Sequence, residues 1–343
     1  MPHIDRIRSQ TDQHDIAQRK SAIDPCIAFA PRMNDQSSPY AGHKRAPTGK
    51  WHIFVKGSGR RNMLKGAAVA AGAMTAPMIS RAQTVSMRFQ STWPAKDIFH
   101  EYANDFATKV NNMASGRLKI EVLPSGAVVP AFQLLDAVNK GTLDGGHGVL
   151  VYHYGKQTAL ALWGSGPGYG MDANMLLSWH KYGGGKELME KLYASVNASV
   201  KSFPYGPMWT QPLGWFKKVM QKADDFKGMK YRTVGISIDV FTGMGMAVNA
   251  LPGGEIVSAM DRGLLDAAEF NNASSDRALG FADVSKVCML QSYHQNAEQF
   301  EIMFNKDKFN ALPEKMRAII SNAVEAASQY MSWKAVDRYS KDY

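Results

Sequence analysis

The chain of 343 residues contains only two cysteines, Cys26 and Cys288. Cys26 lies in a basic N-terminal part, so one cysteine is left for the rest of the chain. This count excludes a disulfide framework and a cysteine-based metal site. The HExxH, GxSxG and GxGxxG patterns are also absent, which leaves no fingerprint of a zinc protease, a serine hydrolase or a dinucleotide-binding enzyme.

An excess of positive charge is absent from most of the chain, although the formal net charge is +10. Residues 1–82 hold 13 Lys and Arg against 5 Asp and Glu, whereas residues 83–343 hold 27 against 25. The basicity therefore lies in the N-terminal leader, and no basic stripe interleaved with aromatic residues follows it. We expect no nucleic-acid partner.

The leader divides into two parts. Residues 1–57 are polar without a sustained apolar period, and we expect them to be disordered. In residues 58–82, Arg60 and Arg61 precede an Ala-rich apolar run, and small residues at Ser80 and Ala82 suit a cut after Ala82. This pattern is typical of a twin-arginine export signal and predicts a periplasmic protein. The run is too short and too rich in Ala and Gly to favour the alternative, a membrane anchor.

The body begins with alternating strand and helix patterns. Strands are expected at 84–90, 118–123 and 143–149, with helices at 97–113 and 132–140 between them. This β-α-β-α-β order predicts a doubly wound α/β domain, in which ligands bind beyond the carboxyl ends of the strands.

The later segments indicate a second lobe. The helix-Gly-x-x-Asp unit that ends in Asp144 recurs at Asp266, which suggests two similar lobes. Further helices are expected at 174–182, 187–195 and 253–262, strands near 200–206, 214–218 and 228–235, and a helix or a Met-rich apolar segment at 242–250. Residues from 309 to 343 have the apolar spacing of a long helix, and we expect that the C-terminus is incomplete because no terminating signal follows.

Arg232 is the most informative polar residue, because it stands in the apolar run from Tyr231 to Ile238. A buried guanidinium requires a partner, and its fork of donors fits a carboxylate. An internal salt bridge is the ordinary interpretation. Our hypothesis is that Arg232 keeps its fork open for a carboxylate that arrives from outside.

Two other polar residues stand in apolar runs, Gln211 and Glu269. Glu269 ends a strand-like stretch and needs Arg232, a bound metal or a solvent-facing edge, and the sequence leaves these three alternatives open. An amide oxygen, a carboxylate and a ligand carboxylate together would suit a hard cation.

With these residues identified, the body, over roughly residues 84–343, resembles the extracytoplasmic solute receptors of tripartite ATP-independent periplasmic (TRAP) transporters. It is similar to the subgroup of 2-oxo-acid receptors, often labelled mannitol/chloroaromatic. The stretches that carry the resemblance are Pro124-Ser-Gly126, Gly141-Thr-Leu-Asp144, Trp179 to Gly185, Gln211-Pro-Leu-Gly-Trp-Phe216, Gly228-Met-Lys-Tyr-Arg232, Leu251-Pro-Gly-Gly-Glu255 and Ala268-Glu-Phe270.

The resemblance implies a periplasmic-binding-protein-like fold of two α/β lobes with a hinge and a long C-terminal helix. Lobe 1 would comprise about 83–205 plus later segments, lobe 2 about 206–305, and the C-terminal helix 309–343. Swapped C-terminal helices can form a homodimer in this subgroup, which stays an open alternative here.

The resemblance also implies roles for the site residues. Arg232 would hold the substrate carboxylate, and Gln211, Glu269 and the carbonyl of Phe270 would hold a cation, Na⁺ or Ca²⁺. Tyr154 is a further candidate for a hydrogen bond to the ligand. The position of Phe270 is typically Trp in the 2-oxo-acid receptors, so the pocket wall differs here.

We therefore expect a binding protein, not an enzyme, that captures a small monocarboxylate such as a 2-oxo acid and delivers it to a TRAP membrane permease. It would need no catalytic cofactor. The alternatives are a periplasmic cofactor-containing enzyme exported by the twin-arginine route, and a receptor for a signalling partner.

Overall fold

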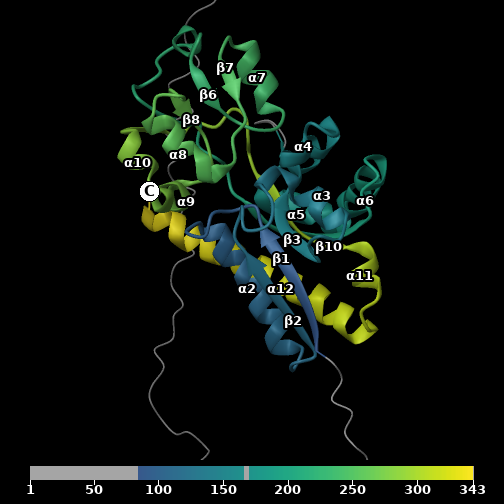
Figure 1. Cartoon of the computed structure of the whole chain (residues 1–343). Helices are drawn as coiled ribbons and strands as arrows, with labels where there is room; N and C mark the ends of the chain where they lie inside the picture. The colour runs from purple at the N-terminus through teal and green to yellow at the C-terminus, as the bar shows by residue number, and fades with distance from the viewer. Residues whose placement is uncertain (1–83, 166–169, 343) are drawn as a thin grey trace, which may run out of the picture. The chain divides into compact units, whose positions relative to one another are not determined.

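The computed structural model describes residues 84–165 and 170–342. The expected disordered extension and twin-arginine signal, residues 1–82, lie outside the described residues. The described residues form one compact unit, which contains two five-stranded sheets (Figure 1). Among the described residues, no helix combines the length and the apolar character needed to cross a membrane.

The first sheet has the strand order β2-β1-β3-β10-β4. Its strands are β1 (Val85–Ser91), β2 (Leu118–Leu123), β3 (Gly145–Val149), β4 (Val200–Met208) and β10 (Glu298–Asn305). Strand β1 runs parallel to β2 and β3, whereas β10 is antiparallel to β3 and β4. The helices of this part of the chain are α2 (Ile98–Met113), η1 (Ala131–Gln133), α3 (Leu134–Asn139), η2 (Leu150–His153), α4 (Thr158–Gly164), α5 (Ala173–Tyr182) and α6 (Gly185–Ser195).

The second sheet has the strand order β7-β6-β8-β5-β9. Its strands are β5 (Gly214–Phe216), β6 (Lys230–Arg232), β7 (Ala247–Asn249), β8 (Ala267–Ala268) and β9 (Val287–Met289). Strand β6 lies parallel to both β7 and β8, while β5 is antiparallel to β8 and β9. The accompanying helices are η3 (Ala223–Phe226), α7 (Ser237–Gly243), α8 (Gly253–Asp261), α9 (Ala273–Leu279) and α10 (Phe281–Val284).

The predicted class of two α/β lobes with a long C-terminal helix is confirmed by these two sheets. Two details differ from the sequence-based expectations. Strand β10, which lies within the range expected for lobe 2, pairs in the first sheet. The expected helix or Met-rich segment at 242–250 contains the end of α7 and the whole of β7, because Gly245, with φ of +88°, separates the two elements.

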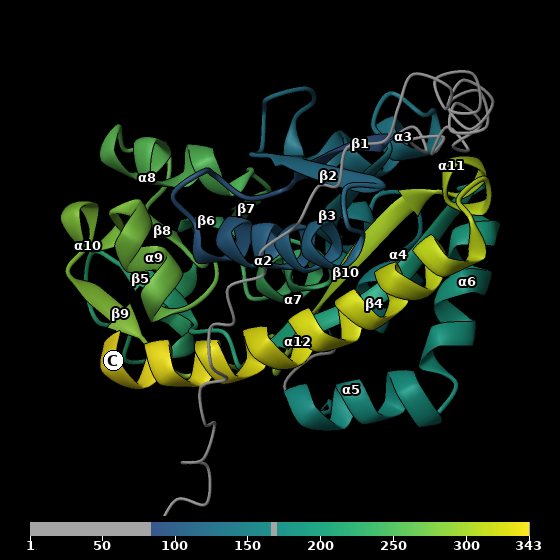
Figure 2. The same cartoon turned by 90° about the horizontal axis from the view of Figure 1, so that it is seen from below.

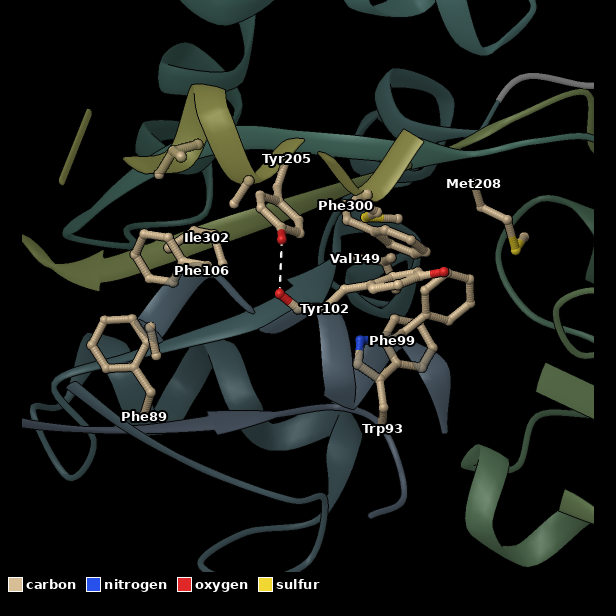
Figure 3. Close-up of a cluster of buried hydrophobic side chains, with 14 of the residues drawn as sticks. Phe89, Trp93, Phe99, Tyr102, Phe106, Val149, Tyr205, Met208, Phe300 and Ile302 are labelled. Carbon is tan, nitrogen blue, oxygen red and sulfur yellow. Dashed lines mark hydrogen bonds between the residues drawn. The ribbon is translucent and has the colours of Figure 1, made fainter. Parts of the chain in front are cut away.

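The core of the first lobe is rich in aromatic residues (Figure 3). Helix α2 begins at a well-formed cap, in which the Asp97 carboxylate accepts a hydrogen bond from the Phe99 amide at 2.9 Å. The apolar face of α2 then buries Phe99, Tyr102 and Phe106 against the sheet. The Tyr205 hydroxyl of β4 donates to the Tyr102 carbonyl at 2.8 Å, as the dashed line in Figure 3 marks, so the helix and the sheet are joined by both apolar and polar contacts.

The C-terminal helix α12 (Glu314–Asp342) follows the short helix α11 (Lys306–Asn310) and has 29 residues. It contacts α2 and β4 of the first lobe and α9 of the second (Figure 2). Its buried residues recur on one side and include Met316, Ile320 and Met331. One helix therefore spans elements of both lobes.

Candidate ligand-binding site

Arg232 ends strand β6 and its side chain is 1% exposed. Its Nε donates to the Leu251 carbonyl at 2.9 Å, and its Nη1 donates to the Glu269 carbonyl at 3.0 Å and to Glu269 Oε1 at 2.9 Å. Its Nη2 is buried and forms no hydrogen bond. The protein thus holds the guanidinium on two of its nitrogens and leaves the third without a carbonyl or carboxylate acceptor, with the Tyr152 hydroxyl as its polar neighbour.

The hypothesis that Arg232 keeps its whole fork free of internal acids is wrong, because Glu269 is its partner. The cause is the sheet topology. Strands β6 and β8 are parallel and pair Arg232 with Ala268, which places Glu269, the next residue, beside the guanidinium. Of the three alternatives for Glu269, the structure shows the pairing with Arg232. A solvent-facing edge is excluded because Glu269 is 1% exposed.

Glu269 retains one oxygen, Oε2, that is buried without a regular hydrogen bond. Burial raises the pKa of Glu269 above its ordinary value, while the Arg232 charge, the Thr233 hydroxyl and the Val234 amide oppose that rise. Oε2 is therefore a desolvated oxygen that lies close to the Thr233 hydroxyl and the Val234 amide and that no cationic side chain of the described residues contacts within ion-pair distance.

The other two expected cation ligands lie beside this acid. The Gln211 side-chain amide donates to the Phe270 carbonyl at 2.7 Å, and both residues are buried. The structure thus brings together Gln211, Glu269 and Phe270, whose amide, carboxylate and carbonyl oxygens are the types that Na⁺ and Ca²⁺ prefer. A cation at this point would need the Gln211 amide to turn its oxygen inward. No cluster of three or more His, Cys, Asp or Glu suited to a metal occurs in the described residues.

A small cavity of about 20 Å³ lies against Arg232. Its walls come from both lobes and are apolar apart from five polar side chains. The lining residues are Trp93, Val149, Val151, Tyr152, Met208, Arg232, Val234, Phe270, Asn271, Gln295 and Glu298. A cavity of this volume holds about one water molecule, so a carboxylate ligand must displace the walls as it enters.

Tyr152 lines this cavity, whereas Tyr154 does not. Burial raises the pKa of the Tyr152 hydroxyl to about 12, and the nearby Arg232 charge opposes that rise. Tyr154 follows at the end of η2, where its hydroxyl donates to the Asp239 carboxylate of α7 on the exposed surface. The structure thus places Tyr154 away from Arg232, and Tyr152 is a lining residue that sequence reasoning missed.

Three other polar lining residues, Asn271, Gln295 and Glu298, were also absent from the sequence-based set. Asn271 directly follows Phe270, so the order of the chain offered a signal for it. Gln295 and Glu298 enter from the loop before β10 and from its first residue. Local sequence contains no signal for them, because only the antiparallel pairing of β10 with β4 places that loop beside Met208.

A second and larger hollow, of about 610 Å³, lies between α5, β4 and α12. The charged residues that line it are Lys181, Lys186 and Glu325, with Lys181 and Glu325 3.2 Å apart and more than half exposed. It has no buried, unpartnered cationic group. Size alone therefore does not identify the ligand site, and the chemistry for binding a carboxylate lies at Arg232.

Comparisons with known proteins agree with this fold. The family model of bacterial extracellular solute-binding protein, family 7 (DctP) matches residues 89–343. A monocarboxylate 2-oxoacid-binding periplasmic protein from Nostoc sp. is 34% identical over 283 residues, which cover 79% of this chain and 76% of that protein.

Two solved structures of TRAP periplasmic solute-binding proteins are also similar. The one from Colwellia psychrerythraea, with bound calcium and pyruvate, is 29% identical with a TM-score of 0.71 and covers 76% of this chain and 78% of its own. The one from Pseudoalteromonas atlantica, with bound sodium and pyruvate, is 27% identical with a TM-score of 0.71 and the same two coverages.

Proposed function

From the premise that this chain belongs to the family 7 extracellular solute-binding proteins, the receptors of TRAP transporters, we propose that it binds a small monocarboxylate, a 2-oxo acid, together with a cation. Members of this family are receptors and not enzymes, in agreement with the sequence-based expectation. The periplasmic enzyme is therefore set aside.

The observation that carries the proposal is the free Nη2 of Arg232 in a buried and largely apolar cavity. An unpaired guanidinium nitrogen in such surroundings is costly until a carboxylate oxygen reaches it. Since Nη1 is already bound to Glu269, the ligand carboxylate contacts Nη2 and the neighbouring Tyr152 hydroxyl. Binding then completes the hydrogen bonds of Arg232.

A bound cation explains why an acid stands so close to an anion-binding site. The Glu269 carboxylate would repel a ligand carboxylate, and Na⁺ or Ca²⁺ held by Gln211, Glu269 and the Phe270 carbonyl would offset that repulsion. The Na⁺ and Ca²⁺ in the pyruvate-bound relatives support this arrangement. The ion supplies charge compensation and a contact for a ligand oxygen.

Thermal denaturation and calorimetry with pyruvate, in Na⁺ or Ca²⁺ buffers, test the proposal. Pyruvate at a hundred times its Kd should stabilise the wild type by about 2.7 kcal/mol. The double variant Arg232→Met/Glu269→Gln removes the ion pair without leaving a lone buried charge, and we expect it to fold and to lose pyruvate binding. Unchanged affinity in this variant would refute the assignment of Arg232.

Two single variants complete the design. Gln211→Met removes one ligand of the proposed cation and should abolish the dependence of pyruvate affinity on Na⁺ or Ca²⁺. Tyr154→Phe is the matched surface control, and we expect it to keep the wild-type affinity. Weaker binding by Tyr154→Phe would instead support the role that sequence analysis gave to Tyr154.

Delivery of the ligand to a TRAP membrane permease is the role that follows from this binding. The lobes would close over the ligand, and the permease would recognise the closed form. A receptor for a signalling partner would bind the same ligand, and growth on the ligand after deletion of the permease genes distinguishes the two roles.

A further inference from the structure

Glu298 is a buried acid beside the ligand cavity that the proposed function does not use. It is the first residue of β10, is 3% exposed and lines the same cavity as Arg232. Its Oε2 accepts a hydrogen bond from the Gln295 amide at 3.0 Å, whereas its Oε1 is buried without a regular hydrogen bond. A Cβ placed on Gly164 would lie 3.3 Å from Oε1, so the helix α4 closes that side of the carboxyl group.

No cation compensates this acid. Glu298 takes part in none of the salt bridges among the described residues, and Arg232 is already paired with Glu269. Burial raises the pKa of Glu298 well above its ordinary value, with the Glu269 charge adding to the effect and the nearby Ser165 hydroxyl opposing it. Burial of a carboxyl group without a cation favours its protonated form, whose O–H can donate a hydrogen bond.

The cavity consequently has two polar ends with different chemistry. Arg232 from the second sheet presents a donor that carries positive charge, and Glu298 from the first sheet presents a buried carboxyl group that no cationic side chain of the described residues compensates. The aromatic and aliphatic walls contributed by Trp93, Val149 and Phe270 offer neither end a partner. A ligand with a carboxylate and a methyl group would satisfy Arg232 and gain no hydrogen bond at Glu298, so it would bind less tightly than a ligand that also carries a hydroxyl there.

We propose that Glu298 determines the ligand class, by forming a hydrogen bond with a hydroxyl group at the end of the ligand opposite its carboxylate. The favoured ligand is then a small monocarboxylate with a terminal hydroxyl. This inference rests on the proposed function, because it takes the carboxylate to lie at Arg232. A hydroxyl both donates and accepts, so it fits the carboxyl group in either protonation state.

The test compares two ligands that differ by a single hydroxyl, pyruvate and 3-hydroxypyruvate, in calorimetry on the full chain. We expect the wild type to bind 3-hydroxypyruvate about tenfold more tightly, the ratio that one buried hydrogen bond supplies. Glu298→Met keeps the side-chain length without a polar end, and the ratio should fall to about one because no hydrogen bond remains. Glu298→Gln keeps a hydrogen-bonding end and should retain most of the preference.

The outcomes separate this inference from the proposed function. Equal affinities in the wild type, or a Glu298→Met variant that weakens both ligands by the same factor, would overturn the role of Glu298 and leave the carboxylate receptor intact. Binding of neither acid by the wild type would overturn both. If Glu298→Met does not fold, as circular dichroism would show, the wild-type ratio and the Glu298→Gln ratio still decide the matter.

Discussion

Arg232 and Glu269 depend on each other for their stability as buried charges. Removing one partner leaves an uncompensated ion in the interior, a change that costs about 3–5 kcal/mol in comparable pairs. We therefore predict that Arg232→Met alone lowers the free energy of unfolding by this amount. The measurement is urea denaturation followed by circular dichroism.

The double variant Arg232→Met/Glu269→Gln is the control for this prediction. It leaves no buried charge at the site and should recover more than half of the lost stability. Equal losses in the single and double variants would mean that the guanidinium stabilises the fold through Leu251 and not through its ion pair.

Phe270 provides a second prediction at the scale of one side chain. Its ring lies over Gly253 at the start of α8, where an added Cβ would come within 2.0 Å of the ring. Gly253→Ala must displace the ring, which also stacks on Phe281 at a centroid distance of 6.0 Å. We expect a loss of about 1–3 kcal/mol in the free energy of unfolding, together with weaker pyruvate binding.

Gly254 is the matched control for this substitution. It is the next residue of the same helix, and an added Cβ there would meet only Pro94 at an ordinary 3.6 Å. Gly254→Ala should therefore keep the wild-type stability and pyruvate affinity. Similar losses of stability in both variants would show that any side chain at the start of α8 is destabilising, whether or not it displaces the ring of Phe270.

Sequence analysis identified Gln211, Arg232 and Glu269 because each stands in an apolar run, where a buried polar group requires a hydrogen-bond or ionic partner. Their pairing could not be predicted in the same way. The Arg232–Glu269 contact depends on the adjacency of β6 and β8, which are separated by α7, β7 and α8 in the chain. Sequence analysis selected Tyr154, whereas Tyr152 lines the cavity. The two tyrosines lie two residues apart around the η2 turn, and their local sequence does not indicate which side chain faces inward.

At the scale of elements, α12 is joined to α2 by a network of charges. Arg338 contacts both carboxylate oxygens of Glu101 at 2.8 and 3.0 Å, and Lys334 lies 3.0 Å from Asp105. These groups are partly exposed, so solvent screens them and the network is worth about 0.5–1 kcal/mol. We predict that Glu101→Gln lowers the free energy of unfolding by this amount at low salt and by less in 1 M NaCl.

A control ion pair for this network lies within α12 itself. Asp337 and Lys341 form a pair within α12 at 2.7 Å, and both side chains are more than 60% exposed. Asp337→Asn should change the urea midpoint by less than half as much as Glu101→Gln. An equal change would mean that helix propensity, and not contact between α12 and α2, controls the measurement.

The elements with strong periodicity were predicted well, and the short ones were not. The first strands and α2 agree with their sequence patterns within a residue or two, because alternation and fourfold spacing extend over whole elements. Strands β7, β8 and β9 have two or three residues each, too few to show a period. Helix α4, with seven residues, was not among the expected elements.

At the scale of the whole molecule, two sets of buried titratable groups have opposite effects on the free energy of unfolding as the pH changes. Burial raises the pKa of Asp97, Asp276 and Glu301 to about 7, so the folded state binds more protons through them than the unfolded state does, and stability falls as the pH rises through 7. Burial also lowers the pKa of His153 and His294 to about 4, which acts in the opposite direction below pH 6.5.

The two effects partly cancel in the wild type. A variant that removes one buried acid therefore shows more clearly how that acid contributes to the pH dependence of stability. Glu301 accepts hydrogen bonds from the hydroxyls of Tyr193 and Ser202, far from Arg232 on the chain. Glu301→Gln cannot ionise. Relative to the wild type, it should therefore gain about 1.4 kcal/mol of unfolding free energy between pH 6 and pH 8.

Urea denaturation of both proteins at pH 6, 7 and 8 measures this difference. The buried amide can still bond to both hydroxyls, so the variant should fold at every pH tested. A difference between the two proteins that does not change with pH would show that Glu301 is already ionised in the folded protein at pH 6.

The far end of α12 bears on how the ligand enters. The Asp342 carboxylate accepts hydrogen bonds from Ser274 at 2.6 Å and Arg277 at 2.9 Å, both on α9, while the middle of α12 is packed on β4. Rotation of the second sheet away from the first must therefore either bend α12 or detach Asp342 from α9. Access to Arg232 is thus coupled to the contacts of Asp342, so a spin label near residue 342 would sense an incoming solute that it never touches.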